Sequence, residues 1–539
     1  MHNLSTLPQA SAGCVPAGVT DPQGKDAFEV RFGTATAEAT KTGTVTHATN
    51  GDENLADRSG SYTKCLKQTS YGVVDPTAFA KFQAALASGS PADFEAMGML
   101  GGTRKLNGPL GAFALTLVGA DSQSFGDTIV PPPPSVQSKE YATELVELYW
   151  ASLLRDVPFT EYESNATAQA ASSELTALKQ WYKGPLDGGK VTPRVLFRGG
   201  FNSDPKYFAQ EALGPYISQL CIRPTSLGAQ QIDQRMQSFA AGVDYMTYLP
   251  EWQDVQNGIS TPMTSGPIAL DPDRRYMHNG RALGAFTHQD ELYQAYFVAY
   301  LVLNSLETRP NPWNPYKAFK NQQPFGTFGG PDIAATLGAV ARAAINAVWY
   351  QKWLVHLRHR PESGGGLVHL QKTGIGTADA KVDPIVLNSN ALKASHGRYD
   401  SYLLSQAFPE GSPAHPAYPT GHGTVGGACI TVLKFFFDGQ APISDPMVPA
   451  ADGLSLEPYT GAGAGQMTLN GELHKLAHNI SFGHGIHAGI HWRSDTDYSL
   501  LLGEAVALKF LQDQAYTYEE EVNVTLTKMD GNAVTIKNT

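Results

Sequence analysis

The segment from Gly329 to Lys352 constrains the fold more than any other part of the chain. It opens with Gly-Gly-Pro-Asp, and proline in the first turn is typical of a helix start. Apolar residues then recur at helical spacing, at Ile333, Leu337, Val340, Ala344 and Val348. A helix with such an apolar face packs against other helices, and the same face extended by four residues reaches Lys352. A buried lysine needs an anionic partner, although Lys352 can also snorkel to solvent or pair with a core carboxylate.

Further helical patterns run over 139–155 and 288–303, and the second is apolar nearly all round. Strand signals are scarce, apart from alternating apolar residues on both sides of Asp530-Gly531, which predict a C-terminal β-hairpin. We therefore predict a mainly α fold with a few short hairpins. A flexible segment (1–27) is expected to precede a single domain (28–539). That domain would comprise an N-terminal part to about residue 130, a helical catalytic part (136–515) and the hairpin (520–537).

Charge and cysteine content exclude several classes of partner. The net charge of −11 disfavours nucleic acid and anionic membranes, and no run of 18 apolar residues would span a bilayer. Cys14, Cys65, Cys221 and Cys429 show no C-x-x-C spacing, so a metal knuckle is not expected, and a bond between the first two stays open. The first 24 residues lack a basic segment followed by an apolar core, so we expect a cytoplasmic protein.

The first cationic segment is Lys352-x7-Arg360-Pro361. On a continuous helix the two cations would lie about 12 Å apart along the axis. Because proline disfavours helix in the residue before it, we expect Pro361 to end the helix just after Arg360 and to let that side chain fold back. Two converging cations suit an oxyanion such as phosphate or vanadate.

The second segment is Tyr418-Pro-Thr-Gly-His-Gly-Thr424, followed by a helical pattern. Thr420 and Gly421 at a helix start offer a hydroxyl and free backbone N–H groups, both of which suit an anion. His422 in the first turn would face the same site as an acid or base. The alternative is a plain capped helix with an incidental histidine.

The third segment is rich in histidine. His484, His487 and His491 have spacing i, i+3, i+7, so a regular helix would place them on one face. Asp495 lies four residues beyond His491 and can accept a hydrogen bond from its ring, which would fix the tautomer. The alternative for such a helix is packing and solvent exposure.

Together these segments resemble the vanadium-dependent haloperoxidases, within the wider superfamily that includes acid phosphatases. The resemblance extends over nearly the whole chain. It includes NGDE from Asn50, FEAMGMLGGTRKLNGPLGAF from Phe94, LYWASLLRDVPF from Leu148, GPYISQ from Gly214, THQDELYQAYF from Thr287 and FGGPDIAATLGAVARAAINAVWYQKW from Phe328. It implies a helical-bundle fold, and the eight-residue step from lysine to arginine resembles the bromoperoxidase-like and bacterial branch. The family also suggests a homo-oligomer, such as a dimer.

Carried over residue by residue, the resemblance assigns roles around one vanadate. Lys352 and Arg360 resemble two cationic clamps, and Thr420 replaces the family's serine while keeping the hydroxyl. Gly421 supplies a backbone N–H. His422 resembles the histidine that exchanges protons with peroxide, and His491 the axial ligand of vanadium. In the family, the metal activates peroxide for attack by halide without changing its oxidation state.

One family residue is missing. The family pattern before the axial histidine is Arg-x-x-x-Gly-x-His, and counting back from Gly489 reaches Gly485. Either arginine has become Gly485, or it has become His484 with one residue inserted after it. We favour the second alignment, because both flanks then match and a local bulge can absorb the extra residue. Losing this charge-assisted contact costs on the order of 1.5–3 kcal/mol, roughly tenfold to hundredfold in vanadate affinity.

The favoured prediction is therefore a vanadium-independent enzyme without a cofactor. As isomerase-type homologues of napyradiomycin-like pathways imply, it would rearrange an α-hydroxyketone derived from an aromatic meroterpenoid or naphthoquinone. His422 or His491 would abstract a proton, while Lys352 and Arg360 would stabilise the oxyanion.

Two alternatives stay open. One is a vanadium-dependent chloro- or bromoperoxidase in which protonated His484 replaces the arginine. The other is a phosphatase-like enzyme or a divalent metal site formed by His484, His487 and His491. All three readings expect a small organic substrate or an oxyanion, phosphate or vanadate, in the same pocket.

Overall fold

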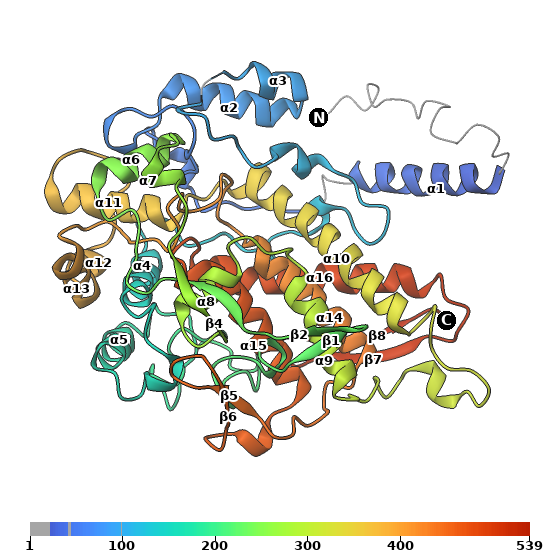
Figure 1. Ribbon diagram of the computed structural model, residues 1–539. Coiled ribbons are helices and arrows are strands. Elements are labelled where there is room, and N and C mark those ends of the chain that lie inside the picture. The colour runs from blue at the N-terminus through green and yellow to red at the C-terminus, as the bar shows by residue number, and fades with distance from the viewer. Residues whose placement is uncertain (1–21, 41–44, 99) are drawn as a thin grey trace.

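Helices dominate the secondary structure of this computed structural model, which describes residues 22–40, 45–98 and 100–539. Figure 1 shows them arranged around a bundle in which α10, α14 and α16 lie close together. The α-helices are α1 (Pro22–Ala39), α2 (Pro76–Ser88), α3 (Pro91–Ala96), α4 (Lys139–Leu153), α5 (Ala166–Ala177), α6 (Leu249–Asn257), α7 (Pro262–Ser265), α8 (Gly280–Phe286), α9 (Gln294–Ser305), α10 (Gly330–Tyr350), α11 (Pro361–Thr373), α12 (Pro384–Leu387), α13 (Asn390–Tyr399), α14 (Gly421–Phe436), α15 (Leu469–Phe482) and α16 (Arg493–Ala515).

Strands form only two-stranded antiparallel sheets within the described ranges. They are β1 (Thr225–Leu227) with β2 (Gln230–Ile232), β3 (Met236–Phe239) with β4 (Leu270–Arg275), β5 (Met447–Pro449) with β6 (Leu456–Pro458), and β7 (Asn523–Thr527) with β8 (Ala533–Lys537). In the last pair Asn523 faces Lys537, and Gly531 takes a φ of 80° at the turn. The mainly α class and the C-terminal hairpin are thus confirmed.

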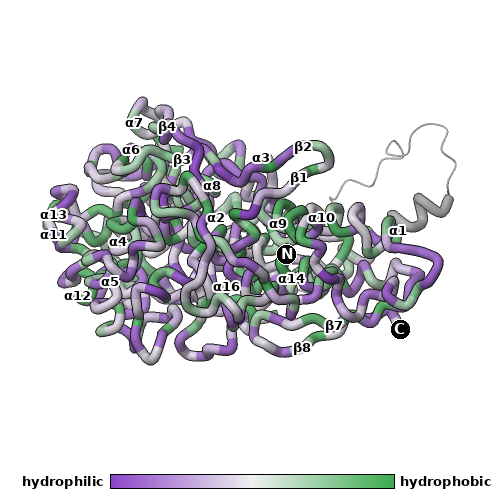
Figure 2. Tube along the Cα trace, turned by 60° about the horizontal axis from the view of Figure 1, so that its bottom comes forward, coloured by the Kyte–Doolittle hydropathy of each residue, from purple (hydrophilic) through white to green (hydrophobic). Residues whose placement is uncertain are grey.

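The centre of the fold is α14, every residue of which is buried. It packs against α10, α15 and α16, and its contact with α16 requires glycine. A Cβ on Gly427 would lie 2.1 Å from the carbonyl oxygen of Leu500, and one on Gly503 would lie 2.0 Å from that of Thr424. The two helix backbones therefore approach closely, which fixes the start of α14 against the start of α16. Figure 2 shows hydrophobic segments around α9 and α14 in the interior.

Helix α10 begins where the Gly-Gly-Pro-Asp sequence predicts, with Gly329 as its N-cap. It continues from Gln351 to His356 as a π-helix, marked by the bond from Leu357 N–H to the Lys352 carbonyl five residues earlier. By length and composition the helix 330–356 could cross a membrane, but half of its most apolar window is buried, and α10 packs on α14 and α16. Burial of this kind is typical of a core helix.

Two predicted helix boundaries are wrong. The helix before Arg360 ends at His356, where Leu357 takes a φ of 43°, and Pro361 begins α11 instead of ending the earlier helix. Proline suits a first helical turn, whose N–H groups have no intrahelical acceptor. The helix expected over 288–303 begins only at Gln294, which leaves 287–293 as a turn beside the site described below.

The division of the chain into a segment 1–27 and a domain 28–539 stays a prediction. Helix α1 begins at Pro22, inside the segment expected to be flexible, and residues 1–21 lie outside the described residues. Cys65, Cys221 and Cys429 are buried free thiols. Cys14, for which the sequence leaves a bond to Cys65 open, also lies outside the described ranges.

Candidate anion-binding site

Lys352 lies in the π-helix that continues α10, and its side chain is fully buried. Its Nζ donates to the carbonyl oxygens of Pro416 at 2.8 Å and Ala417 at 2.7 Å. Among the described carboxylates, none forms an ion pair with it, so neither predicted alternative, snorkelling or a core ion pair, occurs. Burial first, and then the charge of Arg360, hold the pKa of Lys352 well below its usual value. A bound anion would relieve both effects.

Arg360 is the N-cap residue of α11 and is also fully buried. Its Nε donates to the carbonyl of His415 at 3.0 Å, and Nη1 donates to the carbonyl of Ile490 at 2.9 Å and to Nε2 of His491 at 2.7 Å. Burial lowers the pKa of Arg360 to about 10.

The partners of Arg360 differ from those of most buried arginines in this protein. In the described part of the chain, six arginines are buried: Arg155, Arg198, Arg281, Arg358, Arg360 and Arg493. Four of them pair with carboxylates: Arg155 with Asp244, Arg281 with Asp156 and Asp244, Arg358 with Glu144 and Asp495, and Arg493 with Glu147. Because a buried charge without a counter-ion is costly, Arg360 is suited to an anion supplied from outside the chain.

The start of α14 contributes neutral donors to the same region. Thr420 is its N-cap, yet its hydroxyl makes no capping bond and lies 3.5 Å from the hydroxyl of Thr496. The N–H groups of Gly421, His422 and Gly423 belong to the first turn, where no intrahelical acceptor exists. Together with the helix dipole they favour a negative charge at this end.

His491 is held in one tautomer. A guanidinium can only donate, so Nε2 of His491 accepts from Arg360 and the ring proton lies on Nδ1. That Nδ1 donates to Asp495 at 2.9 Å, and the other oxygen of Asp495 accepts from Arg358 at 2.7 Å. Burial, followed by the charges of Arg360 and Lys352, keeps the pKa of His491 well below its usual value, so the ring is neutral with its lone pair on Nε2.

His422 belongs to the same group of rings. Its Nε2 lies 2.8 Å from Oδ1 of Asp290, in the turn before α9, so Nδ1 is the ring atom left for exchange with a ligand. Its ring centroid lies 3.9 Å from that of His484, which in turn lies 5.8 Å from that of His491. Sequence reasoning missed Asp290, although it belongs to the quoted THQDELYQAYF segment, because a continuous helix was expected there.

A π-helix from Gly483 to His487 lies where the sequence suggested an inserted residue. The N–H of Ala488 bonds to the carbonyl of Gly483, five residues earlier, so one extra residue is absorbed locally. A Cβ on Gly485 would lie 3.1 Å from the Cβ of His491 and 3.3 Å from the hydroxyl oxygen of Thr496, so a side chain there would require these neighbours to shift. This geometry favours the alignment in which His484 replaces the arginine.

His484 does not reproduce the charge of an arginine. Its Nδ1 donates to the carbonyl of Thr287 at 3.1 Å, since a carbonyl can only accept. Burial first, and then His422 and His491, hold the pKa of His484 well below its usual value. The ring is therefore neutral and carries a lone pair on Nε2, so that it offers an acceptor where an arginine would offer donors.

The expectation that His487 shares a face with His484 and His491 is wrong. The π-helix and the turn at Gly489, with a φ of 84°, direct His487 into an aromatic cluster, where its Nε2 lies 3.1 Å from the hydroxyl of Tyr216. Over the described ranges, no group of three or more histidine, cysteine or acidic residues is arranged to hold a metal ion. A divalent metal site at the three histidines therefore has no structural support.

His415 is a second site residue that sequence reasoning missed. Its Nδ1 lies 3.0 Å from Nη2 of Arg360 and 3.1 Å from the carbonyl oxygen of Pro416, and its ring lies 4.7 Å from that of Trp349. Burial, with the charges of Arg360 and Lys352, keeps its pKa well below the usual value. The only sequence signal was its position five residues before Thr420.

The donor set fits an oxyanion such as vanadate. Two buried cations lack carboxylate partners, one hydroxyl lacks a capping role, and one helix start directs N–H groups to the same region. The Nε2 lone pair of His491, fixed by Asp495, is a suitable ligand for vanadium. The predicted residues Lys352 and Arg360 thus come together with Thr420, Gly421, His422, His484, His491 and Asp495.

The chain is similar along most of its length to known enzymes. It is 34% identical over 529 residues to a vanadium-dependent bromoperoxidase of Ascophyllum nodosum, and the match covers 93% of this chain and 90% of the relative. It is 30% identical over 615 residues to that of Corallina officinalis, covering 97% of this chain and 100% of the relative. Among solved structures, the homohexameric second vanadate-dependent bromoperoxidase of A. nodosum gives a TM-score of 0.85 at 26% identity, covering 99% of this chain and 95% of that one. No protein-family model matches.

Proposed function

The chain belongs to the vanadium-dependent haloperoxidase family, and from this premise we propose that it binds vanadate and oxidises halide with hydrogen peroxide. The observation that carries the proposal is the pair of fully buried cations, Lys352 and Arg360, which form no ion pair with a carboxylate in the described chain. Arg360 also donates a hydrogen bond to the neutral ring of His491. The names of the relatives support bromide as the halide.

The protein's own groups would divide the work as follows. Lys352, Arg360, the Thr420 hydroxyl and the first N–H groups of α14 would hold the oxygens of the anion, and His491 would bind the metal through Nε2. When bound, vanadate supplies Lewis-acid activation of peroxide. His422, held at Nε2 by Asp290, would hold or move a proton at Nδ1. Because these side chains are buried, water is excluded from the site and each of these electrostatic interactions is stronger.

A second candidate function rests on His484. Because this residue is neutral where the family has an arginine, vanadate would meet a less positive site here than in the family. This observation favours the vanadium-independent isomerase, in which His422 or His491 abstracts the hydroxyl proton of an α-hydroxyketone. The relatives, all of them bromoperoxidases, lend that candidate no support, and we rank it second.

One assay separates the two functions. The purified protein is incubated with orthovanadate, hydrogen peroxide and bromide, and bromination of an electron-rich phenol is followed. We expect turnover that requires vanadate and is lost in His491→Ala, with His396→Ala, an exposed histidine on α13, as the matched control. Absence of vanadate-dependent turnover, together with metal-free conversion of a hydroxyketone that His422→Ala abolishes, would reverse the ranking.

We also propose that the chain assembles into a homo-oligomer, because the solved structural relative is homohexameric. Light scattering coupled to size-exclusion chromatography measures the mass directly. A monomer of 57.8 kDa at micromolar concentration would contradict the proposal.

A further inference from the structure

A cavity of about 370 Å³ lies away from the anion-binding site. Its lining comes from the turn around 159–163, the loops at 193–198 and 214–217, and the end of the β5–β6 hairpin. Its lining includes Phe159, Tyr162, Tyr216 and Tyr459, and the rings of Phe159 and Tyr216 stack on each other at a centroid distance of 3.8 Å. A cavity of this size and character suits one small aromatic molecule.

Arg198 lines this cavity and is 5% exposed. Its guanidinium lies over the ring of Tyr216, 5.1 Å from the centroid. It donates to three backbone carbonyls, through Nε to Arg194 at 2.9 Å, through Nη1 to Glu211 at 3.1 Å and through Nη2 to Gly214 at 3.1 Å. A guanidinium has five N–H donors, so two are left for another acceptor.

Arg198 and Arg360 are the two buried arginines of the described chain that have no carboxylate partner. Arg360 belongs to the anion-binding site, where the missing counter-ion is explained. Arg198 shares the lack of an ion pair but lines the cavity described above. Burial lowers its pKa, although the nearby Tyr216 and Glu211 partly offset that effect. An anionic group beside Arg198 would offset it further.

The lining also includes one carboxylate, Glu163, and two further polar residues bear on the ligand. Tyr162 is 2% exposed, and its hydroxyl has no hydrogen-bond partner among the described residues. The other arginine of the lining, Arg194, is already paired with Asp187 at 2.9 Å, so Arg198 is the arginine of the lining that forms no ion pair.

We propose that this cavity binds a small aromatic carboxylate, whose acid group accepts from Arg198 and whose ring packs against the lining residues Phe159 and Tyr459. The proposal does not depend on the function of the anion-binding site.

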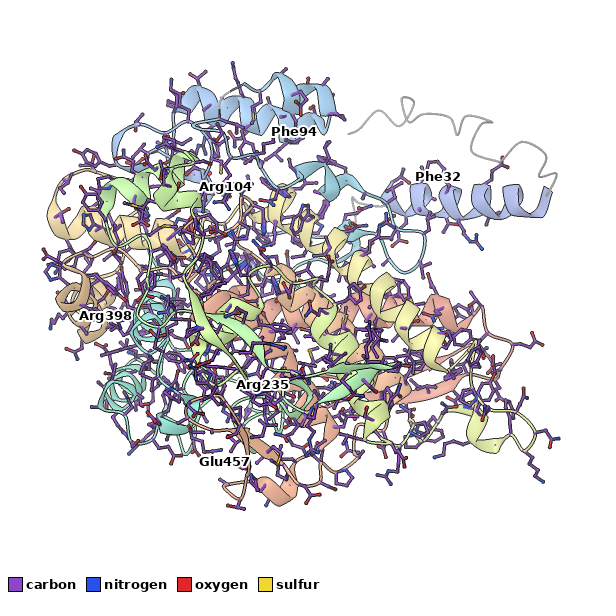
Figure 3. The ribbon with its side chains drawn as sticks, in the orientation of Figure 1. Phe32, Phe94, Arg104, Arg235, Arg398 and Glu457 are labelled. Atoms are coloured by element: carbon purple, nitrogen blue, oxygen red, sulfur yellow. The ribbon has the colours of Figure 1, made fainter. Side chains whose placement is uncertain are left out.

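Benzoate is the probe, and isothermal titration calorimetry of the full-length protein is the measurement. We expect saturable binding of benzoate, and binding at least about tenfold weaker for benzyl alcohol, which has the same ring without the charge. Arg198→Met should weaken benzoate binding by a similar factor. The control is Arg235→Met, at an arginine that is labelled in Figure 3 and whose side chain is 42% exposed and paired with Asp233. This change should leave the benzoate affinity unchanged.

A second variant protects the test against misfolding of Arg198→Met. Ala462 lines the cavity from the exposed loop after β6, so Ala462→Trp fills the cavity without touching the buried guanidinium, and it should also abolish binding. Unchanged benzoate affinity in Ala462→Trp, or in a folded Arg198→Met, would overturn the proposal. No detectable binding of millimolar benzoate to the unmodified protein would overturn it as well.

Discussion

Replacing His484 by arginine should tighten the binding of vanadate. His484 is buried and neutral, donates from Nδ1 to the Thr287 carbonyl, and lies between the rings of His422 and His491. Arginine at this position would add a permanent charge and donors where the histidine offers a lone pair. One charge-assisted hydrogen bond contributes about 1.5–3 kcal/mol, so we expect the Kd to fall roughly tenfold to hundredfold.

The assay is calorimetric titration of orthovanadate into phosphate-free protein, with thermal unfolding as a check that His484→Arg is folded. His396→Arg is the matched control, because it adds the same charge at a side chain that is 39% exposed on α13, and its Kd should not change. Equal or weaker binding by folded His484→Arg would refute the reasoning, because it would mean that residue 484 does not face the anion.

Three further predictions concern the site and the core. Asp290→Asn should lower the rate of bromide oxidation at least about tenfold, because His422 loses its carboxylate partner. The vanadate Kd should stay within a factor of about three, because the cations that hold the anion are unchanged. Steady-state kinetics and calorimetry measure the two effects separately. For His478, burial alone would lower the pKa, but two neighbouring carboxylates raise it to about 9. Its contribution of about 3 kcal/mol to unfolding free energy should be present below pH 6.5 and lost as pH rises through 9, a loss absent in His478→Gln when urea unfolding is measured across that range. Gly503→Ala should lower the free energy of unfolding by roughly 2–3 kcal/mol, because its Cβ would lie 2.0 Å from a carbonyl oxygen of α14. Gly338→Ala on α10, where the space around the glycine is open, should raise it by about 0.5–1 kcal/mol. Equal melting temperatures of the two variants would contradict both predictions.

The helical pattern was sufficient to predict α10 and the arrival of its apolar face at Lys352. It was not sufficient to predict where that helix ends, because Leu357 takes a left-handed conformation that a leucine does not signal. Tertiary contacts hold it there: the Leu357 carbonyl accepts from the Tyr62 N–H. Pro361 was therefore read as a helix end although it is a helix start.

The sequence predicts the hydrogen-bond partner of a site histidine only where the two residues are close in sequence. Asp495 lies four residues after His491, and its bond to that ring follows from spacing. Asp290 lies 132 residues before His422, and no local pattern connects them. His487 was assigned to the wrong face because a π-helix changes the angular step between residues.

We propose that Lys352, Arg360, the start of α14 and His491 surround one vanadate. A crystal structure of the protein with orthovanadate would show whether they do. We expect a single vanadate within hydrogen-bond distance of Lys352 Nζ and the Arg360 guanidinium, with vanadium bonded to Nε2 of His491. Vanadate ordered at another site, or Arg360 still bonded to His491 with no anion beside it at saturating vanadate, would refute this proposal.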